Sequence, residues 1–205
     1  MHLNFKIVIV TLLSVQLSWS QEKEKDTAIT RDTFVEGFIE IAYTQPIFYG
    51  NNFISEGYDV KNTINIGLTK GIHSMVLHLD LNILSSDVVR PEVTGNARDA
   101  NFTRVSGGVG YPLDINPRWQ FLPSLNIGYL KIGQLFGDEK IRDDGFFINA
   151  EVALNYRVVE WIDISLGAQN YFDFISIDAP SEIQSFFNNA QSIYPFLGLR
   201  FRIAE

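Results

Sequence analysis

The chain has 205 residues, a formal net charge of -8 at pH 7 and no cysteine. This length fits a single domain, and the acidic balance argues against a nucleic-acid partner, because phosphates are bound by basic surfaces. Without cysteine the chain cannot be stabilised by disulfides, so an exported protein of this composition needs another source of stability.

The first 33 residues predict export and a short tail. Lys6 precedes the apolar run IVIVTLLSVQL, which is followed by Ser18, Trp19 and Ser20. A run of about 11 apolar residues is too short to span a membrane and is typical of a signal peptide. We therefore expect a signal peptide over 1–20, a polar periplasmic tail over 21–33 and one domain over 34–205.

From residue 34 onward the sequence alternates between apolar and polar residues with a period of two, which is typical of β-strands. The pattern predicts eight strands, at 34–44, 60–69, 75–84, 101–111, 119–130, 146–158, 162–174 and 192–203. Pro123 and Pro195 fall inside two of these segments and lack a backbone donor, so we expect a bulge or a shifted strand boundary at each.

The connections between these strands alternate in length. Long segments at 45–59, 85–100, 131–145 and 175–191 alternate with short ones at 70–74, 112–118 and 159–161. In an antiparallel up-and-down sheet, alternate connections lie at the same end, so one end carries the long loops. Transmembrane β-barrels show this asymmetry.

The two faces of the strands differ in charge. In MVLHLDLNIL, Met75 begins a wholly apolar series, and His78 and Asp80 lie on the other face. Eight strands enclose an interior just wide enough for side chains, so the large apolar set cannot fit inside. The charged set should face inward, where its acids and bases pair. Its predicted members are Glu36, Glu40, Lys61, Asp80, Arg104, Glu151, Arg157, Asp163, Asp173, Arg200 and Arg202.

Some bulky residues share the inward face with these charges and should fill the remaining space. They are Phe38, Phe102, Tyr171, Tyr194 and Phe196. On the outward face, aromatic residues gather near both strand ends, as girdles at two membrane interfaces would. The predicted girdle residues are Tyr43, Tyr111, Trp119, Phe121, Tyr129, Phe146, Tyr156, Trp161, Phe172 and Phe201.

These features together resemble a known family. The signal peptide, the eight alternating strands, the loop asymmetry and the closing YPFLGLRFRI are similar to the small outer-membrane β-barrels of Gram-negative bacteria. This group includes the transmembrane domain of outer membrane protein A, outer membrane protein X and the opacity-type proteins. The resemblance covers residues 34–205 and implies an all-β, closed, up-and-down antiparallel eight-stranded transmembrane β-barrel in the outer membrane.

The sequence points to no catalytic, cofactor-binding or metal-binding residues. Activation of a serine nucleophile needs a histidine with an orienting carboxylate, but His78 is predicted to point inward, away from lipid substrates. The acidic segments GDEKIRDDG and SEGYD lack the ligand spacing of a calcium loop. The expected partner is therefore the lipid bilayer, and we predict a protein that is not an enzyme.

Three functions remain open at this point. The leading hypothesis is a structural or adhesive role, in which the four long loops contact an extracellular partner. It draws on loop aromatics expected to be exposed, namely Phe48, Tyr49, Phe53, Phe136, Phe186 and Phe187. The alternatives are a narrow porin-like channel for small solutes or ions and a secreted, soluble, lipocalin-like barrel for a lipophilic ligand.

Overall fold

The computed structural model of the chain describes residues 37–94, 96–137, 139–177 and 180–203. The predicted signal peptide (1–20), the predicted tail (21–33) and Glu36 lie outside the described residues.

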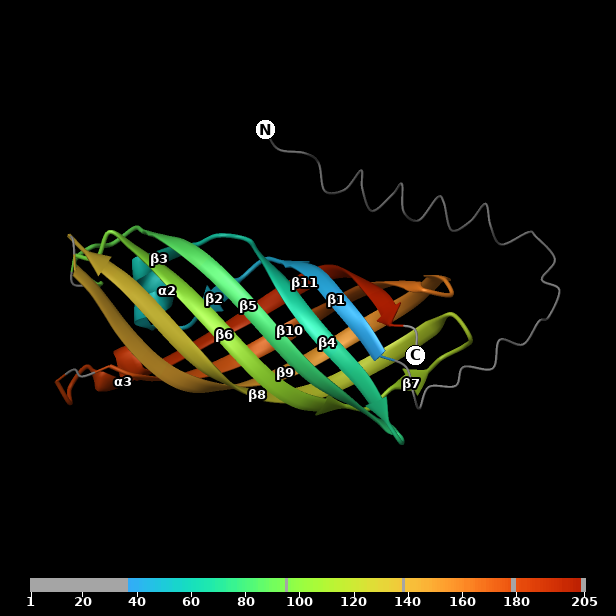
Figure 1. The fold of residues 1–205 in the computed structure, drawn as a ribbon. Helices are drawn as coiled ribbons and strands as arrows, with labels where there is room; N and C mark the ends of the chain where they lie inside the picture. Colours follow the sequence, from blue (N-terminus) through green and yellow to red (C-terminus); the bar gives the residue numbers. More distant parts are fainter. Residues whose placement is uncertain (1–36, 95, 138, 178–179, 204–205) are drawn as a thin grey trace. The chain divides into compact units, whose positions relative to one another are not determined.

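Eight long strands form a closed antiparallel ring in the order β1–β4–β5–β6–β8–β9–β10–β11 (Figure 1). The ring closes because β1 pairs with β4 on one side and with β11 on the other. This confirms the predicted fold class. The strands are β1 (Gly37–Thr44), β4 (Thr63–Ile72), β5 (Met75–Val88), β6 (Asp99–Gly110), β8 (Trp119–Phe136), β9 (Glu139–Val159), β10 (Ile162–Ser176) and β11 (Asn189–Ile203).

Short elements complete the ends of the barrel. Near the long loops lie β2 (Ile47–Tyr49), α2 (Phe53–Gly57), β3 (Tyr58–Val60) and α3 (Gln184–Asn188), and near the short turns lies β7 (Leu113–Asp114). Among the described residues, neither helix is long and apolar enough to cross a membrane. The long-loop end is at the left of Figure 1.

Strands β8 and β9 are longer than predicted. Their pairing continues to Phe136 and Glu139, through the segment 131–145 that the strand pattern predicts to be a long loop. On β9 the side chains of 139–142 are all exposed, so an apolar–polar alternation is not required there, although the backbone still pairs. On β8, by contrast, Ile132 and Gln134 stay buried.

The two strand prolines lie where the neighbouring strand ends or breaks, which corrects the expected bulge or boundary shift. The Pro123 carbonyl accepts from the Tyr111 amide just beyond the end of β6, and the Pro195 carbonyl accepts from the Gln45 amide between β1 and β2. The missing donor of each proline thus faces an interruption in the neighbouring strand. The ladders β8–β9 and β10–β11 continue through Pro123 and Pro195 without a shift in register.

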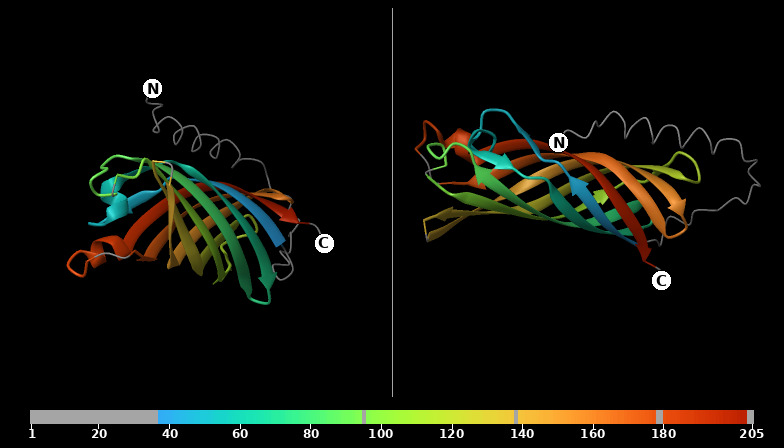
Figure 2. Two further views of the ribbon diagram at one scale, coloured as in Figure 1. Left: turned by 60° about the vertical axis from the view of Figure 1, so that its left-hand side comes forward. Right: turned by 90° about the horizontal axis from the view of Figure 1, so that it is seen from above.

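The outer wall of the barrel is apolar. Along β5, Leu79 and Ile83 are exposed, whereas His78 and Asn82, each one residue before them, are buried. At about 3.3 Å per residue and a tilt of about 40°, the outward series from Phe146 to Val158 on β9 covers roughly 30 Å, the thickness of a hydrocarbon core. This wall defines a membrane-spanning barrel, which is seen from two further sides in Figure 2.

The interior contains two apolar clusters that differ in size. A large one fills the long-loop half and includes Phe53, Phe102, Phe147 and Tyr194. A smaller one, around Leu122 and Phe196, lies toward the short turns. Most of the charged and amide side chains of the interior lie outside these clusters.

Candidate functional site

The polar part of the lumen contains a chain of buried ion pairs. Arg200 on β11 lies 3.5 Å from the Glu40 carboxylate on β1 and 3.8 Å from the Asp163 carboxylate on β10. Arg157 on β9 approaches Asp163 from the other side, at 3.9 Å. Cross-strand pairing produces this arrangement, because Asp163 is opposite Arg200 in one ladder and opposite Arg157 in the next. The pairs connect four consecutive strands of the wall.

Aromatic rings also contribute to this network. The guanidinium of Arg200 stacks on the Phe38 ring with its carbon 4.2 Å from the ring centroid, and Arg202 lies over the same ring at 5.8 Å. Arg202 is half-buried at the short-turn end. Cation–π contacts of this kind strengthen when water is excluded.

Two further acids lie in the same part of the lumen. Glu151 accepts a hydrogen bond of 2.8 Å from the Gln169 amide. Asp80 lies over Gly67, where a Cβ atom would come within 2.6 Å of the Asp80 carboxylate oxygen. Glycine at this inward position therefore makes room for a charged neighbour. His78 is buried on the inward face of β5, two residues before Asp80, as the strand pattern predicted.

A separate ion pair lies deeper, at the border with the large apolar cluster. Arg104 on β6 donates to Asp173 on β10 over 2.6 and 3.4 Å and to the Tyr194 hydroxyl over 2.5 Å. Both charged side chains are at most 1% exposed. The Arg104 guanidinium carbon also lies 4.9 Å from the centroid of the Tyr171 ring and 6.0 Å from that of Phe147. The free-energy cost of removing Arg104 and Asp173 from water is thus offset by these hydrogen bonds and by the contacts of the guanidinium with the aromatic rings.

The first long loop folds into the mouth of the barrel. Asn52 caps α2 through its side-chain oxygen, which accepts from the amides of Ile54 and Ser55, and the Ser55 hydroxyl accepts from the Asn52 amide. The helix thereby inserts Phe53 and Ile54, both at most 2% exposed, into the large apolar cluster. Tyr58 follows and donates to Gln134 on β8, 2.7 Å away.

This arrangement corrects the expectation of exposed loop aromatics. Phe53 is buried, and Phe48, Phe186 and Phe187 are half-buried against the same cluster. Tyr49 remains exposed, and Phe136 is half-buried. The apolar interior of the mouth offers these rings a place away from water, so they pack inward. The capping pattern Asn52–Ser55 was the sequence signal that could have indicated the helix.

Lys61 also differs from the prediction. It lies between β3 and β4, and its side chain is half-exposed and pairs with Asp87 at 2.9 Å, outside the lumen. The second long strand begins at Thr63, so the inward–outward alternation that placed Lys61 inside does not extend to this residue.

The aromatic residues assigned to the girdles lie on the outward face and are exposed or half-buried. At the long-loop end Phe146 is opposite Tyr129, and it stacks on Phe174 with ring centroids 4.7 Å apart. At the short-turn end Trp119 and Tyr156 are also 4.7 Å apart. That these rings mark the two membrane interfaces stays a prediction.

At the long-loop rim, the β8–β9 hairpin projects past the end of β10, while β8 stays paired with β6 as far as Leu135. Lys131 lies opposite Asp144, so charged residues replace the apolar series directly above Tyr129 and Phe146. In the described part of the chain, the pairing of β10 with β9 ends at Asp144, so no strand covers the other edge of β9 over 139–143. The side chains of 139–142 are exposed.

No family model and no curated protein sequence matches the chain. Solved structures do match. Neisserial surface protein A has a TM-score of 0.57 and 11% identity, over 82% of this chain and 96% of that protein. Ail of Yersinia pestis has a TM-score of 0.54 and 13% identity, over 83% of this chain and 99% of that protein. Outer membrane protein W of E. coli has a TM-score of 0.54 and 11% identity, over 84% of this chain and 100% of that protein. At these identities the likeness is one of fold.

The fold is therefore that of the small eight-stranded outer-membrane β-barrels, as the sequence resemblance implied. Together with the apolar outer wall, it makes this chain an integral outer-membrane β-barrel protein, because a closed barrel satisfies its backbone hydrogen bonds in hydrocarbon without any free edge.

Proposed function

We propose that the protein is not an enzyme and that it contacts an extracellular partner through its long-loop end, chiefly through the β8–β9 hairpin. The observation that carries this proposal is the projecting hairpin with the uncovered β9 edge at 139–143. An uncovered strand edge presents backbone donors and acceptors that an extended partner segment can pair with. A rigid barrel holds this edge above the membrane.

The charges of the loops favour some partners over others. The described residues of the four long connections and their flanks contain nine acids and six bases. The acids are Glu56, Asp59, Asp87, Glu92, Asp99, Glu139, Asp143, Asp144 and Glu182, and the bases are Lys61, Arg90, Arg98, Lys131, Lys140 and Arg142. Ail has been crystallised with the heparin analogue sucrose octasulfate. For the present chain the excess of acids favours a neutral or basic protein surface over a sulfated glycan.

The filled lumen weighs against the alternative of a channel. The interior of the mouth contains buried Phe53, Phe102, Phe147 and Tyr194, so little space remains for an aqueous path among the described residues. The outward apolar wall excludes the soluble barrel, which would bury that surface around its ligand.

The test is adhesion of bacteria that display the protein. Deleting 134–141 and joining Gly133 to Arg142 through an Asn-Gly turn removes the projecting edge, because Gly133 and Arg142 are cross-strand partners. Displaying cells should bind at least one coating from a set of extracellular-matrix proteins, and the deletion should abolish this binding. Coated heparin should retain no more displaying cells than vector controls.

The matched control is Ile115→Ser, which changes an exposed apolar residue at the opposite end of the barrel. Both variants should reach the outer membrane and show the same gel migration before and after boiling. Undiminished adhesion of the hairpin deletion would overturn the proposal, as would preferential binding to heparin.

A further inference from the structure

The uncovered edge of β9 has a regular pattern of charge. In chain order its residues are Glu139, Lys140, Ile141, Arg142 and Asp143, which reads acid, base, apolar, base, acid. Successive side chains of a strand point to opposite faces. Phe146 is exposed on the outer wall, and Phe147 is buried in the lumen. By the same alternation, both bases lie on the outward face, and both acids lie on the inward face beside Ile141. Each face of this edge therefore has charges of one sign.

The neighbouring strand β8 does not match these charges. One step closer to the membrane, Lys131 on β8 is opposite Asp144 on β9, so opposite charges face each other there. Within the edge, Asp143 accepts a hydrogen bond of 2.9 Å from the Gln134 amide. The β8 residues opposite 139–143 are all uncharged, namely Phe136, Leu135, Gln134, Gly133 and Ile132. The four charges of the edge therefore have no opposite charge facing them on β8.

A second copy of the same edge does not fit this pattern. Directly opposite residues of an antiparallel pair lie on the same face, so a two-fold axis would pass through one residue position of the edge. Centred on Ile141, such a pair would place Glu139 opposite Asp143. It would also place Lys140 opposite Arg142. Centred on any of the four charged residues, it would place that residue opposite its own copy. Like charges directly opposite are destabilising, so the pattern disfavours pairing of the edge with itself.

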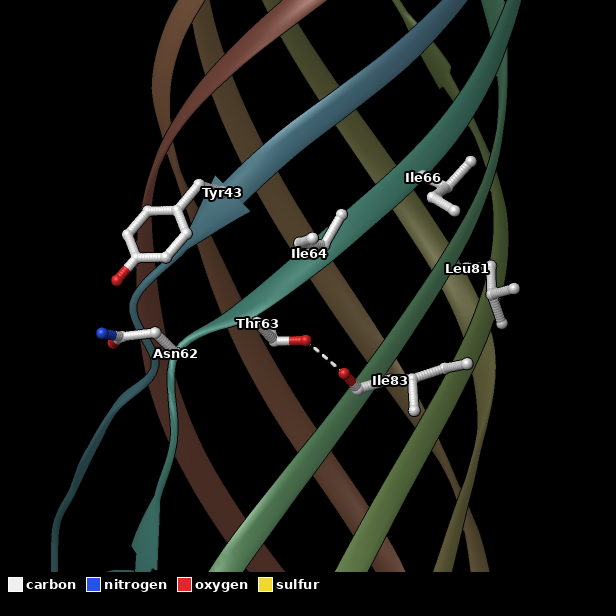
Figure 3. A pocket seen from close by; sticks show the side chains of 7 residues that line it. All are labelled: Tyr43, Asn62, Thr63, Ile64, Ile66, Leu81 and Ile83. Carbon is white, nitrogen blue, oxygen red and sulfur yellow. Dashed lines mark hydrogen bonds between the residues drawn. The ribbon is translucent and has the colours of Figure 1, made fainter.

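The sheet is also interrupted between β1 and β4, but that place suits a partner strand less well. The β1–β4 ladder ends at Thr44 and Thr63, and the Thr63 hydroxyl donates to the Ile83 carbonyl of β5 (Figure 3). Beyond this point β2 pairs with β11 and β3 pairs with β5, so the two sides separate. Both β2 and β3 are only three residues long. Lys61, which follows β3, is already paired with Asp87 at 2.9 Å.

We propose that the β9 edge binds an extended protein segment with the residue order base, acid, apolar, acid, base, which adds to the sheet as a further strand. Each charge of the edge then faces an opposite charge, and Ile141, which is 46% exposed, faces an apolar side chain. The order reads the same in both directions, so it suits a parallel or an antiparallel partner. This inference rests on the proposed function and specifies the chemistry of its partner.

The experiment titrates two end-capped peptides of identical composition against the isotope-labelled protein in detergent, followed by NMR. The matched peptide is Thr-Thr-Lys-Glu-Val-Glu-Lys-Thr-Thr, and the exchanged peptide is Thr-Thr-Glu-Lys-Val-Lys-Glu-Thr-Thr. The matched peptide should shift the amide signals of 139–143 and bind about fivefold more tightly than the exchanged one, equivalent to about 1 kcal/mol. Because salt screens exposed charges, this preference should shrink between about 50 mM and about 0.5 M salt.

A variant with a reversed edge tests the same pattern from the side of the protein. It exchanges all four charges, keeps the net charge and should bind the exchanged peptide more tightly than the matched one. Its substitutions are Glu139→Lys, Lys140→Glu, Arg142→Glu and Asp143→Lys. The matched control reverses an exposed ion pair elsewhere at the long-loop end, through Lys61→Asp and Asp87→Lys. This control should keep the preference of the wild type.

The outcomes separate this inference from the proposed function. Gel migration before and after boiling verifies that each variant is folded. Equal binding of the two peptides, abolished by the deletion of 134–141, would overturn the charge pattern and leave the edge as the contact site. Peptide binding that survives this deletion would overturn both. Binding of neither peptide would overturn this inference alone, because the adhesion of displaying cells tests the proposed function independently.

Discussion

Breaking the buried pair between Arg104 and Asp173 is the sharpest test of the interior. Arg104→Met removes the guanidinium that donates to Asp173 over 2.6 and 3.4 Å and to the Tyr194 hydroxyl. The Asp173 carboxylate, 0% exposed in the wild type, then stays buried without its cation.

The magnitude follows from the burial of both groups. Removing one partner of a fully buried ion pair costs about 3–5 kcal/mol, because the remaining charge has lost its compensation. Replacing both partners by apolar residues of similar volume is often neutral or stabilising. We therefore expect Arg104→Met to lower the free energy of unfolding by about 3–5 kcal/mol, and the double variant with Asp173→Leu to recover most of this loss.

The assay is equilibrium unfolding of the refolded barrel by urea in detergent, followed by tryptophan fluorescence and by gel migration without boiling. The wild type, both single variants and the double variant form a complete cycle. A loss below about 1 kcal/mol for Arg104→Met would match a surface pair and refute the buried network. A double variant as unstable as the sum of the two singles would refute the coupling between Arg104 and Asp173.

Three other measurements probe different parts of the molecule. In planar bilayers the wild type should be silent, and Phe53→Ala, which removes the ring that α2 inserts into the mouth, should allow brief conductance events. Steady wild-type conductance would refute the filled lumen. Burial raises the pKa of Asp143, so the Asp143 carboxyl keeps its proton to a higher pH in the folded state than in the unfolded chain. Stability should then fall as pH rises from the ordinary carboxyl pKa through the raised value, and Asp143→Asn should remove this dependence in pH-resolved thermal unfolding. Gly128→Ala would place a Cβ against the Val105 carbonyl oxygen and 2.5 Å from the Phe147 ring, and it should cost about 1–3 kcal/mol in urea unfolding. Gly133→Ala should be nearly neutral, because its nearest contact is the flexible Lys140 side chain at 3.2 Å.

The sequence predicted the architecture because the two-residue alternation of apolar and polar residues is repeated in every long strand. The large apolar side chains at the uncharged alternate positions, such as Leu79 and Ile83, are too many to fit inside a barrel of eight strands. Their outward direction therefore followed from volume alone. The inward direction of Arg104, Asp163 and Arg200 followed from the same alternation. Which acid each arginine meets was not predictable, since Arg104 reaches Asp173 across the lumen and Arg200 meets Glu40 where the barrel closes.

The loops were the least predictable part, for a related reason. Phe53 was expected to be exposed because it lies in a polar segment between strands. Its burial depends on the apolar residues that seven strands bring to the mouth, including Phe102 and Tyr194. Likewise, the pairing of 131–136 with 139–144 leaves little trace in the sequence, because the side chains of 139–142 are all exposed and show no alternation.

The sequence by itself determined that this chain forms a closed barrel with its hydrocarbon side chains outward, because a period of two and the limited volume of eight strands leave no other arrangement for so many large apolar residues. Only the tertiary structure decided how the lumen is divided into an ion-paired half and an aromatic half. It also decided that β1 and β4 separate at their rim, because both features depend on contacts between residues that the sequence keeps far apart.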